Sequence, residues 1–231
     1  MNSENNSKNQ KKKRPFYSFF YNFCYDFVRL TGAIPMYIFL RPKIYHPYNA
    51  KTPKGKMLVS ANHRSFLDPV LVHIAIPTRR MHSLATDHLF DTKLKSAFFS
   101  KMHCIKVDKE NFSLSSMHAV ISRLQDDKAV IIFPEGSISR DDNDLVRTFK
   151  SGAVLMAHRA GAPIVPMYIP KHQKWYHRYR VIVGKPFDVR AELGKMPTLE
   201  QLNNASETLR KIEVELREYY ENLPVYKKIN K

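Results

Sequence analysis

The sequence predicts an α/β fold, in which one domain is built on a central, mostly parallel (mixed) sheet and helices flank that sheet. Short apolar runs alternate with amphipathic segments from residue 44 onward, a pattern typical of parallel sheets with helical crossovers. The chain has 231 residues and 43% of them are apolar, which suffices for one substantial core but not for two complete domains. We therefore expect one domain over residues 44–223, followed by a basic tail at 224–231.

Two kinds of segment alternate within this domain. Short runs of apolar and β-branched residues predict strands at 57–61, 82–86, 104–107, 129–133, 163–169 and 179–183. Apolar residues at helical spacing predict helices at 69–76, 91–101, 113–126, 150–160 and 198–221. Since ligands of parallel sheets bind beyond the carboxyl ends of the strands, polar residues just after these strands are the first candidates for a site.

The N-terminal part of the chain differs in composition from the domain. Residues 1–14 are polar and end in a Lys-Lys-Lys-Arg cluster, which predicts a disordered basic arm. Residues 15–43 hold Phe at helical spacing, and Gly32 and Pro35 divide the segment into an amphipathic helix and a shorter helical piece. Because Asp26 interrupts the apolar run, as does a nearby Arg, we expect neither a clean transmembrane helix nor a signal peptide.

Two interpretations of this aromatic helix are open. Behind a basic cluster it suits an interfacial membrane anchor, in which cations meet anionic headgroups and aromatic rings enter the acyl boundary. In the alternative, the helix packs its Phe stripe on the core of the domain. The first interpretation, which we favour, places the protein on the cytoplasmic face of the cell membrane as a peripheral, monotopic protein.

The formal net charge of +17 indicates an anionic partner: nucleic acid, an acidic lipid surface or a phosphorylated substrate. A basic aromatic stretch at 171–180 would suit nucleic acid. We prefer a surface loop near lipid headgroups or an acidic carrier protein, with a plain solvated loop as the alternative, and expect no nucleic-acid partner. The sequence contains no G-x-S-x-G, G-x-G-x-x-G or P-loop motif, which removes the main support for a serine hydrolase or a dinucleotide enzyme. Cys24 and Cys104 have no metal-ligand spacing and fit a reducing compartment.

The stretch at 57–69, MLVSANHRSFLDP, is the first candidate site. Its apolar start predicts a buried strand that delivers Asn62, His63 and Asp68 to a turn. Asp68 precedes Pro69, and this pair suits a helix start with Asp68 as N-cap. In such a turn the Asp68 carboxylate can accept a hydrogen bond from one His63 nitrogen and leave the other as a base for a substrate hydroxyl. The alternative is a loop histidine beside an ordinary helix cap.

The second candidate is the stretch at 129–140, AVIIFPEGSISR. A fully apolar strand runs into the motif F-P-E-G, a sharp turn after which backbone amides and polar side chains can face a ligand. Taken alone, this is an ordinary exit from a strand. It nevertheless ends at the same expected edge of the sheet as His63.

These two stretches belong to a set of four ordered blocks that resembles the 1-acylglycerol-3-phosphate acyltransferase family of glycerolipid acyltransferases. The family blocks N-H-x4-D, G-x-I-x-V-D-R, F-P-E-G-T-R-S and an apolar V-P strand correspond to residues 62–68, 103–109, 133–139 and 164–167. The stretch F-K-S-G-A at 149–153 is similar to a further family motif. One such block would be weak evidence, whereas four in order make a specific signal.

The resemblance implies an α/β acyltransferase that moves a fatty acyl group from acyl-CoA or acyl carrier protein (acyl-ACP) to lysophosphatidate, giving phosphatidate. It implies that His63 is the general base and that Asp68 orients it. Contacts with substrate are expected at Asn62, Lys109, Glu135, Gly136, Ser137 and Arg140. No metal or cofactor is expected, because a thioester is already a good acyl donor. The expected partners are lysophosphatidate, the acyl donor and an anionic phospholipid membrane.

Two departures from the family pattern change the expected charge at the site. The usual Arg of the third block is Ile138 here, so Arg140, Arg147 or Lys150 would have to supply that cation. Lys109 keeps the charge of the usual Arg but lacks its planar, bidentate fork. The acceptor is therefore the open part of the prediction. The alternatives are another lysophospholipid or an acylated amino lipid as acceptor, or a non-enzymatic basic protein that binds membranes or nucleic acid.

Overall fold

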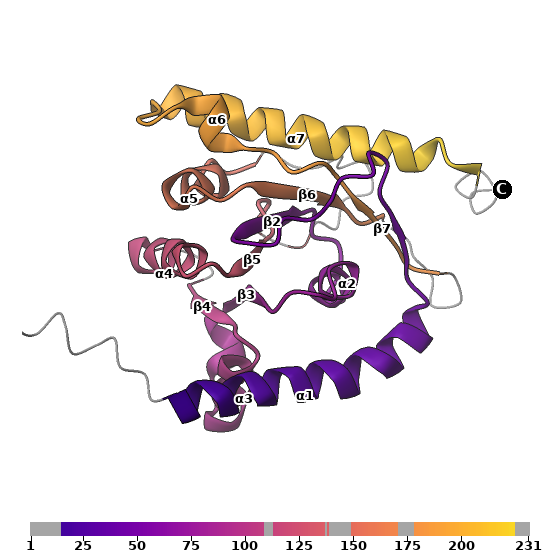
Figure 1. Ribbon diagram of the computed structural model, residues 1–231, viewed down its shortest axis with the longest axis vertical. Coiled ribbons are helices and arrows are strands. Elements are labelled where there is room, and N and C mark those ends of the chain that lie inside the picture. Colours follow the sequence, from indigo (N-terminus) through magenta and orange to yellow (C-terminus); the bar gives the residue numbers. More distant parts are fainter. Residues whose placement is uncertain (1–14, 109–112, 137, 139–148, 171–177, 225–231) are drawn as a thin grey trace, which may run out of the picture.

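The computed structural model describes residues 15–108, 113–136, 138, 149–170 and 178–224, and within them the chain forms the predicted α/β domain (Figure 1). The strands are β1 (Lys43–Tyr45), β2 (Met57–Ala61), β3 (Met81–Thr86), β4 (Ile105–Val107), β5 (Ala129–Ile132), β6 (Ile164–Tyr168) and β7 (Arg180–Val183). They pair in the order β1-β7-β6-β2-β5-β3-β4, and each pairing is parallel except that of β6 with β7. The predicted mostly parallel, mixed sheet is confirmed.

Helices cover both faces of the sheet (Figure 1). They are α1 (Pro15–Leu40), α2 (Asp68–Ala75), the 3-10 helix η2 (Asp87–Phe90), α3 (Lys93–Lys101), α4 (Leu114–Gln125), α5 (Gly152–Ala160), α6 (Val189–Leu193) and α7 (Leu199–Glu221). On one face α4, α5 and α7 pack through side chains such as Leu124, Val154 and Leu209. On the other face α2 and the C-terminal end of α1 pack through Leu71 and Leu40.

The central strand β2 is buried on both faces. All five of its residues are buried, and it pairs in parallel with β5 on one side and with β6 on the other. Because side chains alternate along a strand, Leu58 enters the core below α4, α5 and α7, whereas Met57 and Val59 enter the core below α2. A continuous apolar run is what a strand covered on both faces requires. The loop that follows β2 therefore starts from a fixed point.

α1 is one helix of 26 residues, so the expected division into two pieces at Gly32 and Pro35 is wrong. A proline inside a helix costs about 3 kcal/mol, because it removes a hydrogen bond and crowds the preceding turn. Continuing the helix past Pro35 brings Met36 and Leu40 to the core below α2, where Leu40 is fully buried. Burying a large apolar side chain contributes about 1.5 to 3 kcal/mol, which offsets most of that cost.

The outward face of α1 carries an exposed apolar stripe. Its members are at least 55% exposed and recur every three or four residues: Phe23, Phe27, Leu30, Ile34, Tyr37 and Ile38. The rest of the helix contacts the domain: on the opposite side Tyr25 Oη accepts a hydrogen bond from the Met81 N–H at 3.1 Å, and on the flank Asp26 pairs with Arg80. The alternative in which the Phe stripe packs on the core is therefore wrong for the described part of this helix.

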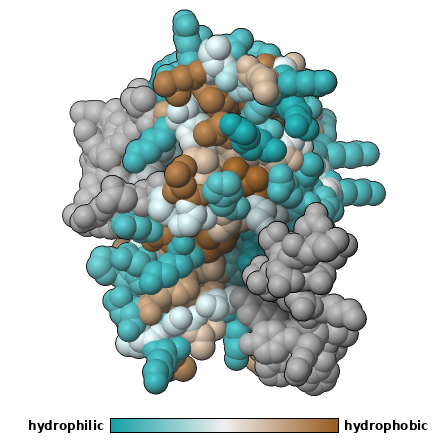
Figure 2. Space-filling model, turned by 90° about the vertical axis from the view of Figure 1, so that its left-hand side faces the viewer, coloured by the Kyte–Doolittle hydropathy of each residue, from teal (hydrophilic) through white to brown (hydrophobic). Residues whose placement is uncertain are grey.

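Outside α1, exposed apolar side chains are scattered. Leu94, Leu114 and Met196 are all more than 70% exposed, but they lie on α3, on α4 and between α6 and α7. Figure 2 shows one side of the molecule, on which hydrophilic side chains surround small hydrophobic groups. Single exposed apolar residues are ordinary on a protein surface, whereas a continuous stripe such as that of α1 marks an interaction surface.

The remaining differences from the sequence prediction are three short elements that were not predicted, and two predicted terminal segments are not tested. The sequence did not predict β1, η2 and α6, because a segment of three to five residues is too short for a hydrophobic periodicity to be recognised. The predicted basic arm at 1–14 and nearly all of the predicted basic tail at 224–231 lie outside the described residues.

Gly184, directly after β7, allows β6 and α7 to approach closely. A Cβ atom at this position would lie 2.8 Å from Cγ of Pro166 and 3.0 Å from a methyl group of Leu216. We expect Gly184→Ala to lower the free energy of unfolding by about 1 to 3 kcal/mol, measured by urea denaturation. Gly152→Ala is the control, because nothing lies within 4 Å of the added Cβ and α5 gains helix propensity. Equal stability of Gly184→Ala and the native chain would contradict this close packing.

Candidate active site

The loop after β2 holds His63 and Asp68 in hydrogen-bond contact. His63 Nδ1 lies 2.9 Å from Asp68 Oδ2. The same oxygen accepts hydrogen bonds from the backbone N–H groups of Arg64 and Ser65, at 2.6 and 2.7 Å. The Asp68 side chain is 1% exposed and that of His63 is 18% exposed. A buried carboxylate requires polar partners of this kind, so the loop backbone and His63 together fix its position.

The expected role of Asp68 as N-cap of the next helix is wrong. α2 begins at Asp68 itself, and Leu67 occupies the N-cap position without a side-chain cap. The carboxylate of Asp68 is turned back toward the preceding loop, where it accepts the three hydrogen bonds described above. Pro69 follows within the first turn, where its missing N–H leaves no intrahelical hydrogen bond unmade.

The ring of His63 stacks on the ring of Phe133. Their centroids are 4.1 Å apart and the ring planes differ by 18°. The contact arises because β2 and β5 are parallel neighbours, with Ser60 opposite Ile132, so the loops after the two strands leave the sheet at the same edge. The two stretches expected to meet there do so. Within the described residues Nε2 of His63 has no hydrogen-bond partner, and the side chain is partly exposed, so a ligand can reach this nitrogen.

The segment after β5 forms the sharp turn that the F-P-E-G motif predicts. The Gly136 N–H donates to the Phe133 carbonyl at 3.0 Å, and Gly136 adopts a left-handed conformation with φ of +75°. A Cβ atom at Gly136 would lie 3.6 Å from Nζ of Lys150, so this lysine, one of the candidate cations from the sequence, lies beside the turn. Glu135 is buried, with 7% of its surface exposed.

Asn62 joins the ends of two strands. Its side-chain amide donates to the carbonyl of Ile169 at 2.9 Å and accepts from the N–H of Ile169 at 2.7 Å. The residue is fully buried. These two bonds link the loop after β2 to the end of β6 and so support the backbone that carries His63. The expected contact between Asn62 and substrate stays a prediction, because its amide is engaged here with the main chain.

Three of the expected substrate contacts lie outside the described residues. They are Lys109, Ser137 and Arg140. Ile138, which stands where the family usually has Arg, is described and is partly buried. Of the candidate cations named from the sequence, Lys150 is the one that the described part of the chain places beside the turn after β5.

A buried acidic residue that the sequence reasoning missed lies beneath the site. Glu213 of α7 is fully buried, and its Oε1 accepts a hydrogen bond from the Ser60 hydroxyl at 2.7 Å. Burial raises the pKa of Glu213 well above its usual value, and the negative charge of Glu135 raises it further. The contact links α7 to the strand that precedes His63, and burial favours the protonated form of the Glu213 carboxyl group.

The sequence contained a signal that Glu213 is buried, although not one that identifies its partner. Leu202, Leu209 and Leu216 form the buried face of α7, and Glu213 falls on that face four residues after Leu209. A single acidic residue within an otherwise apolar helical face is unusual, because a buried carboxyl group needs a specific partner.

The arrangement offers an oriented base, an aromatic platform and a nearby cation. Asp68 fixes the side of the His63 ring that it contacts and leaves Nε2 facing outward, which suits removal of a proton from a hydroxyl group. Within the described residues, no three His, Cys, Asp or Glu side chains are grouped as ligands for a metal ion.

Known proteins resemble this chain in sequence and in fold. The sequence profile of the Acyltransferase family matches residues 41–170. The chain is 29% identical over 172 residues to the 1-acyl-sn-glycerol-3-phosphate acyltransferase of Bacillus subtilis, covering 72% of this chain and 83% of that protein. It is 31% identical over 111 residues to the protein of the same name from Streptococcus pneumoniae, covering 48% of this chain and 40% of that protein.

A solved structure has the same architecture. The chain is similar to the crystal structure of PlsC, the 1-acyl-sn-glycerophosphate (LPA) acyltransferase of Thermotoga maritima, with a TM-score of 0.61. The alignment covers 90% of each chain at 18% sequence identity. At this identity the likeness supports the α/β fold described above.

The raised pKa of Glu213 predicts a pH-dependent stability. The folded pKa is raised, so stability is complete below the usual value of 4.5 and is lost as the pH rises toward the folded pKa, by up to about 1.4 kcal/mol per pH unit. Glu213→Gln removes this loss, and its stability relative to the native chain should therefore increase with pH above 4.5. Urea denaturation between pH 4 and 8 measures the difference, with Glu215→Gln at an exposed position of α7 as control. Parallel stability curves for Glu213→Gln and the native chain would exclude a raised pKa of Glu213.

Proposed function

This chain belongs to the acyltransferase family, and we propose that it transfers a fatty acyl group from acyl-CoA or acyl carrier protein to the free hydroxyl of lysophosphatidate. The observation that carries the proposal is the hydrogen-bonded pair of His63 and Asp68, which lies against Phe133 at the edge of the sheet. The relatives from B. subtilis and S. pneumoniae are named 1-acyl-sn-glycerol-3-phosphate acyltransferases, which supports lysophosphatidate as the acceptor.

In the proposed reaction, Nε2 of His63 takes the proton of the lysophosphatidate hydroxyl as the hydroxyl oxygen attacks the thioester carbonyl. A carbon–oxygen bond forms and the carbon–sulfur bond breaks. The leaving thiolate then takes the proton from the imidazolium, so His63 returns to its neutral form. The products are phosphatidate and the free thiol of coenzyme A or of the carrier protein.

Asp68 is proposed to select the reactive nitrogen of His63. By accepting a hydrogen bond from Nδ1 it favours the tautomer with the proton on that atom, which leaves Nε2 as the base. It also stabilises the imidazolium that forms during the attack. The backbone donors of Arg64 and Ser65 keep the carboxylate in place, so the orientation of the ring does not depend on the histidine alone.

The acceptor phosphate is proposed to bind near the turn after Phe133. Lys150 provides a cation beside Gly136 in the described structure, and Lys109 and Arg140, outside the described residues, are the further candidates. Glu135 would repel a phosphate, so a hydroxyl group or a backbone amide suits it better as a partner.

The apolar stripe of α1 supports binding at the surface of a membrane. By length and mean hydropathy, Asn22–Leu40 would also qualify as a membrane-spanning helix, and 12% of that segment is buried. Tyr25 and Asp26 hold α1 along the domain, however, so we propose that it lies in the interface plane with the stripe in the acyl boundary. The domain would then rest on the cytoplasmic face of the membrane, where anionic lipids attract its positive charge.

Removing the base tests the proposed chemistry. We expect His63→Ala and Asp68→Asn each to lower kcat by roughly 10² to 10⁴-fold, because the first removes the proton acceptor and the second its orienting charge. The assay follows formation of phosphatidate from lysophosphatidate with acyl-CoA and with acyl carrier protein. His88→Ala, an exposed histidine on η2, is the control. Full activity of His63→Ala would rule out the mechanism, and no transfer by the native chain from either donor would favour the non-enzymatic alternative.

Changing the apolar stripe tests the proposed membrane contact. Phe27, Ile34 and Ile38 are 57%, 56% and 69% exposed, so replacing all three with Ser removes lipid contacts without opening the core. We expect vesicle affinity to fall by roughly 10²-fold or more, since each large apolar side chain contributes about 1.5 to 3 kcal/mol when buried. Sedimentation with phospholipid vesicles measures the loss, with Met196→Ser and Leu199→Ser, far from α1 in the sequence, as the control pair. Unchanged sedimentation of the triple variant would show that α1 is not the membrane contact.

A further inference from the structure

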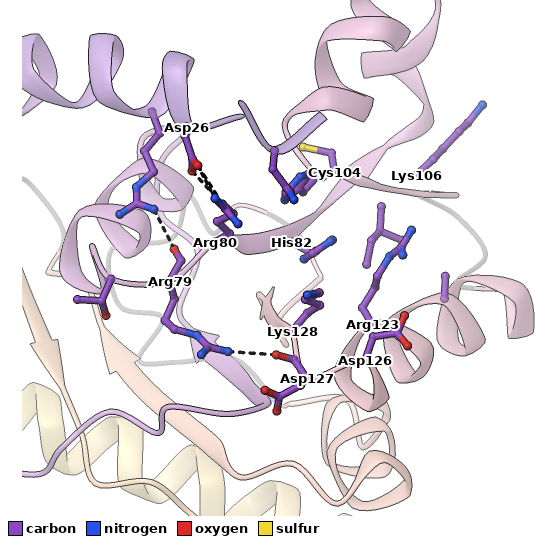
Figure 3. A pocket seen from close by; sticks show the side chains of 16 residues that line it. Asp26, Arg79, Arg80, His82, Cys104, Lys106, Arg123, Asp126, Asp127 and Lys128 are labelled. Atoms are coloured by element: carbon purple, nitrogen blue, oxygen red, sulfur yellow. Dashed lines mark hydrogen bonds and ion pairs between the residues drawn. The ribbon is translucent and has the colours of Figure 1, made fainter. Parts of the chain in front are cut away.

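A cavity lies at the end of the sheet opposite to His63. Its volume is about 1220 Å³, and it is lined by α1, α4, the segments that lead into β3 and β5, and the start of β4 (Figure 3). His82 is the second residue of β3, so it marks the amino-terminal edge of these parallel strands. His63 follows the carboxyl end of β2, which means that the two sites are separated by the length of the sheet.

Cations outnumber carboxylates in the lining of this cavity, by six to three. The cations are Arg29, Arg79, Arg80, Lys106, Arg123 and Lys128, and the carboxylates are Asp26, Asp126 and Asp127. Part of this charge is used within the protein. Arg80 pairs with Asp26, and the Arg79 guanidinium donates to the carbonyls of Gly55 and Asp127 at 2.8 and 3.2 Å.

The Lys106 ammonium lies 5.9 Å from the centroid of the Phe90 ring, whereas Arg123 and Lys128 have no partner of either kind in the part of the chain that the structure describes. Within the described residues, the side chains of Arg123 and Lys128 make no hydrogen bond and no ion pair, and Figure 3 shows both beside His82. Their charges act on the buried rings, since both contribute to lowering the pKa values of His82 and His103. An Arg and a Lys that line one cavity without an ion-pair partner, in a lining where cations outnumber carboxylates, form a site for an anion.

Two stacked rings, those of His82 and His103, line the cavity, and Tyr25 stacks on His103. The centroid of His103 lies 4.4 Å from that of Tyr25 and 4.8 Å from that of His82, and the planes differ by 12° and 17°. His82 is 8% exposed, and its Nδ1 is buried without a hydrogen-bond partner among the described residues. Burial, together with the neighbouring cations, lowers the pKa of His82 to about 3 and that of His103 to about 4.

A ligand oxygen would satisfy this buried nitrogen. An unpaired buried polar atom costs about 1 to 3 kcal/mol, and Nδ1 of His82 has no hydrogen-bond partner among the described residues. An anion at this position would also offset the repulsion that Arg123 and Lys128 exert on a protonated ring. The wall thus provides a hydrogen-bonding atom beside two cations that have no ion-pair partner among the described residues.

The cavity opens along the flank of α1. Asn22, Asp26 and Arg29 line it from this helix, and at about 100° per residue they lie roughly 100° around the helix from the apolar stripe. If the stripe enters the acyl boundary, as the proposed function holds, this flank lies at the depth of the lipid headgroups. The mouth of the cavity would then face the layer in which phosphate groups are most concentrated.

We propose that this cavity binds a phosphate group, and that at the membrane this group belongs to the headgroup of an anionic phospholipid. The Arg123 guanidinium and the Lys128 ammonium hold the phosphate oxygens, and the buried edge of His82 closes the site. The binding of phosphate in solution follows from the cavity alone, whereas its supply by a headgroup rests on the proposed function. The site is separate from the centre of acyl transfer.

The test replaces the two unpaired cations in the full chain. Arg123→Ala with Lys128→Ala is compared with Arg159→Ala and Lys185→Ala, a control pair that removes the same two residue types from exposed positions outside the cavity. Inorganic phosphate is titrated while the ring signals of His82 are followed by NMR. Vesicles of phosphatidylcholine with and without phosphatidylglycerol are used in sedimentation, and acyl transfer is measured with lysophosphatidate in detergent micelles.

The expected result is specific to the cavity. Phosphate shifts the His82 signals of the native chain and of the control pair, and Arg123→Ala with Lys128→Ala weakens this binding by roughly tenfold or more. The same variant loses the preference for phosphatidylglycerol but still binds phosphatidylcholine through α1, and its acyl transfer is unchanged. A response to phosphate without a change in vesicle binding assigns the site to soluble phosphate rather than a headgroup.

Two results would overturn the proposal. One is that phosphate leaves the His82 signals of the native chain unchanged while vesicle binding is insensitive to Arg123 and Lys128. The other is that the control pair lowers binding as much as the cavity pair does, because the effect would then be one of net charge. Neither result bears on acyl transfer, which His63→Ala tests, so failure of this site and failure of the proposed function are distinguishable.

Discussion

The hydrogen bond between His63 and the buried carboxylate of Asp68 is the interaction on which the candidate active site depends. A histidine in a surface loop samples many orientations, and either of its nitrogens can carry the proton. Here the carboxylate is 1% exposed and is fixed by two backbone N–H groups, so it offers the ring one partner in one place. The stacking of His63 on Phe133 restricts the ring from a second direction. Geometry of this kind allows proton transfer with little rearrangement.

The fold supports this pair from three sides. β2 is buried on both faces and sets the start of the loop, and Asn62 ties the loop to the end of β6 through both groups of its amide. On the face of the sheet covered by α7, the carboxyl group of Glu213 accepts a hydrogen bond from the Ser60 hydroxyl. The last helix of the chain is therefore coupled to the strand that carries the site, although more than 150 residues separate the two.

The sequence predicted the fold class, most of the elements and the meeting of the two principal motifs, because parallel strands release their loops at one edge. Prediction from the sequence failed where tertiary contacts override the local conformational preference of a residue. Pro35 was expected to break the N-terminal helix, but the helix continues because Leu40 is buried in the core. Asp68 was expected to be the N-cap of α2, but its carboxylate accepts hydrogen bonds from the preceding loop instead. The partner of Glu213 was not predictable, since no local pattern pairs residues 60 and 213.

The proposed chemistry depends on Asp68 setting the tautomer of His63. The ¹⁵N NMR spectrum of the His63 ring, recorded for the native chain and for Asp68→Asn at a pH where the ring is neutral, reports which nitrogen carries the proton. We expect Nδ1 to carry the proton in the native chain and this preference to be lost in the variant, where an amide replaces the carboxylate. A native ring with its proton on Nε2 would exclude His63 as the base, because the nitrogen that is free of Asp68 would then be unable to accept a proton.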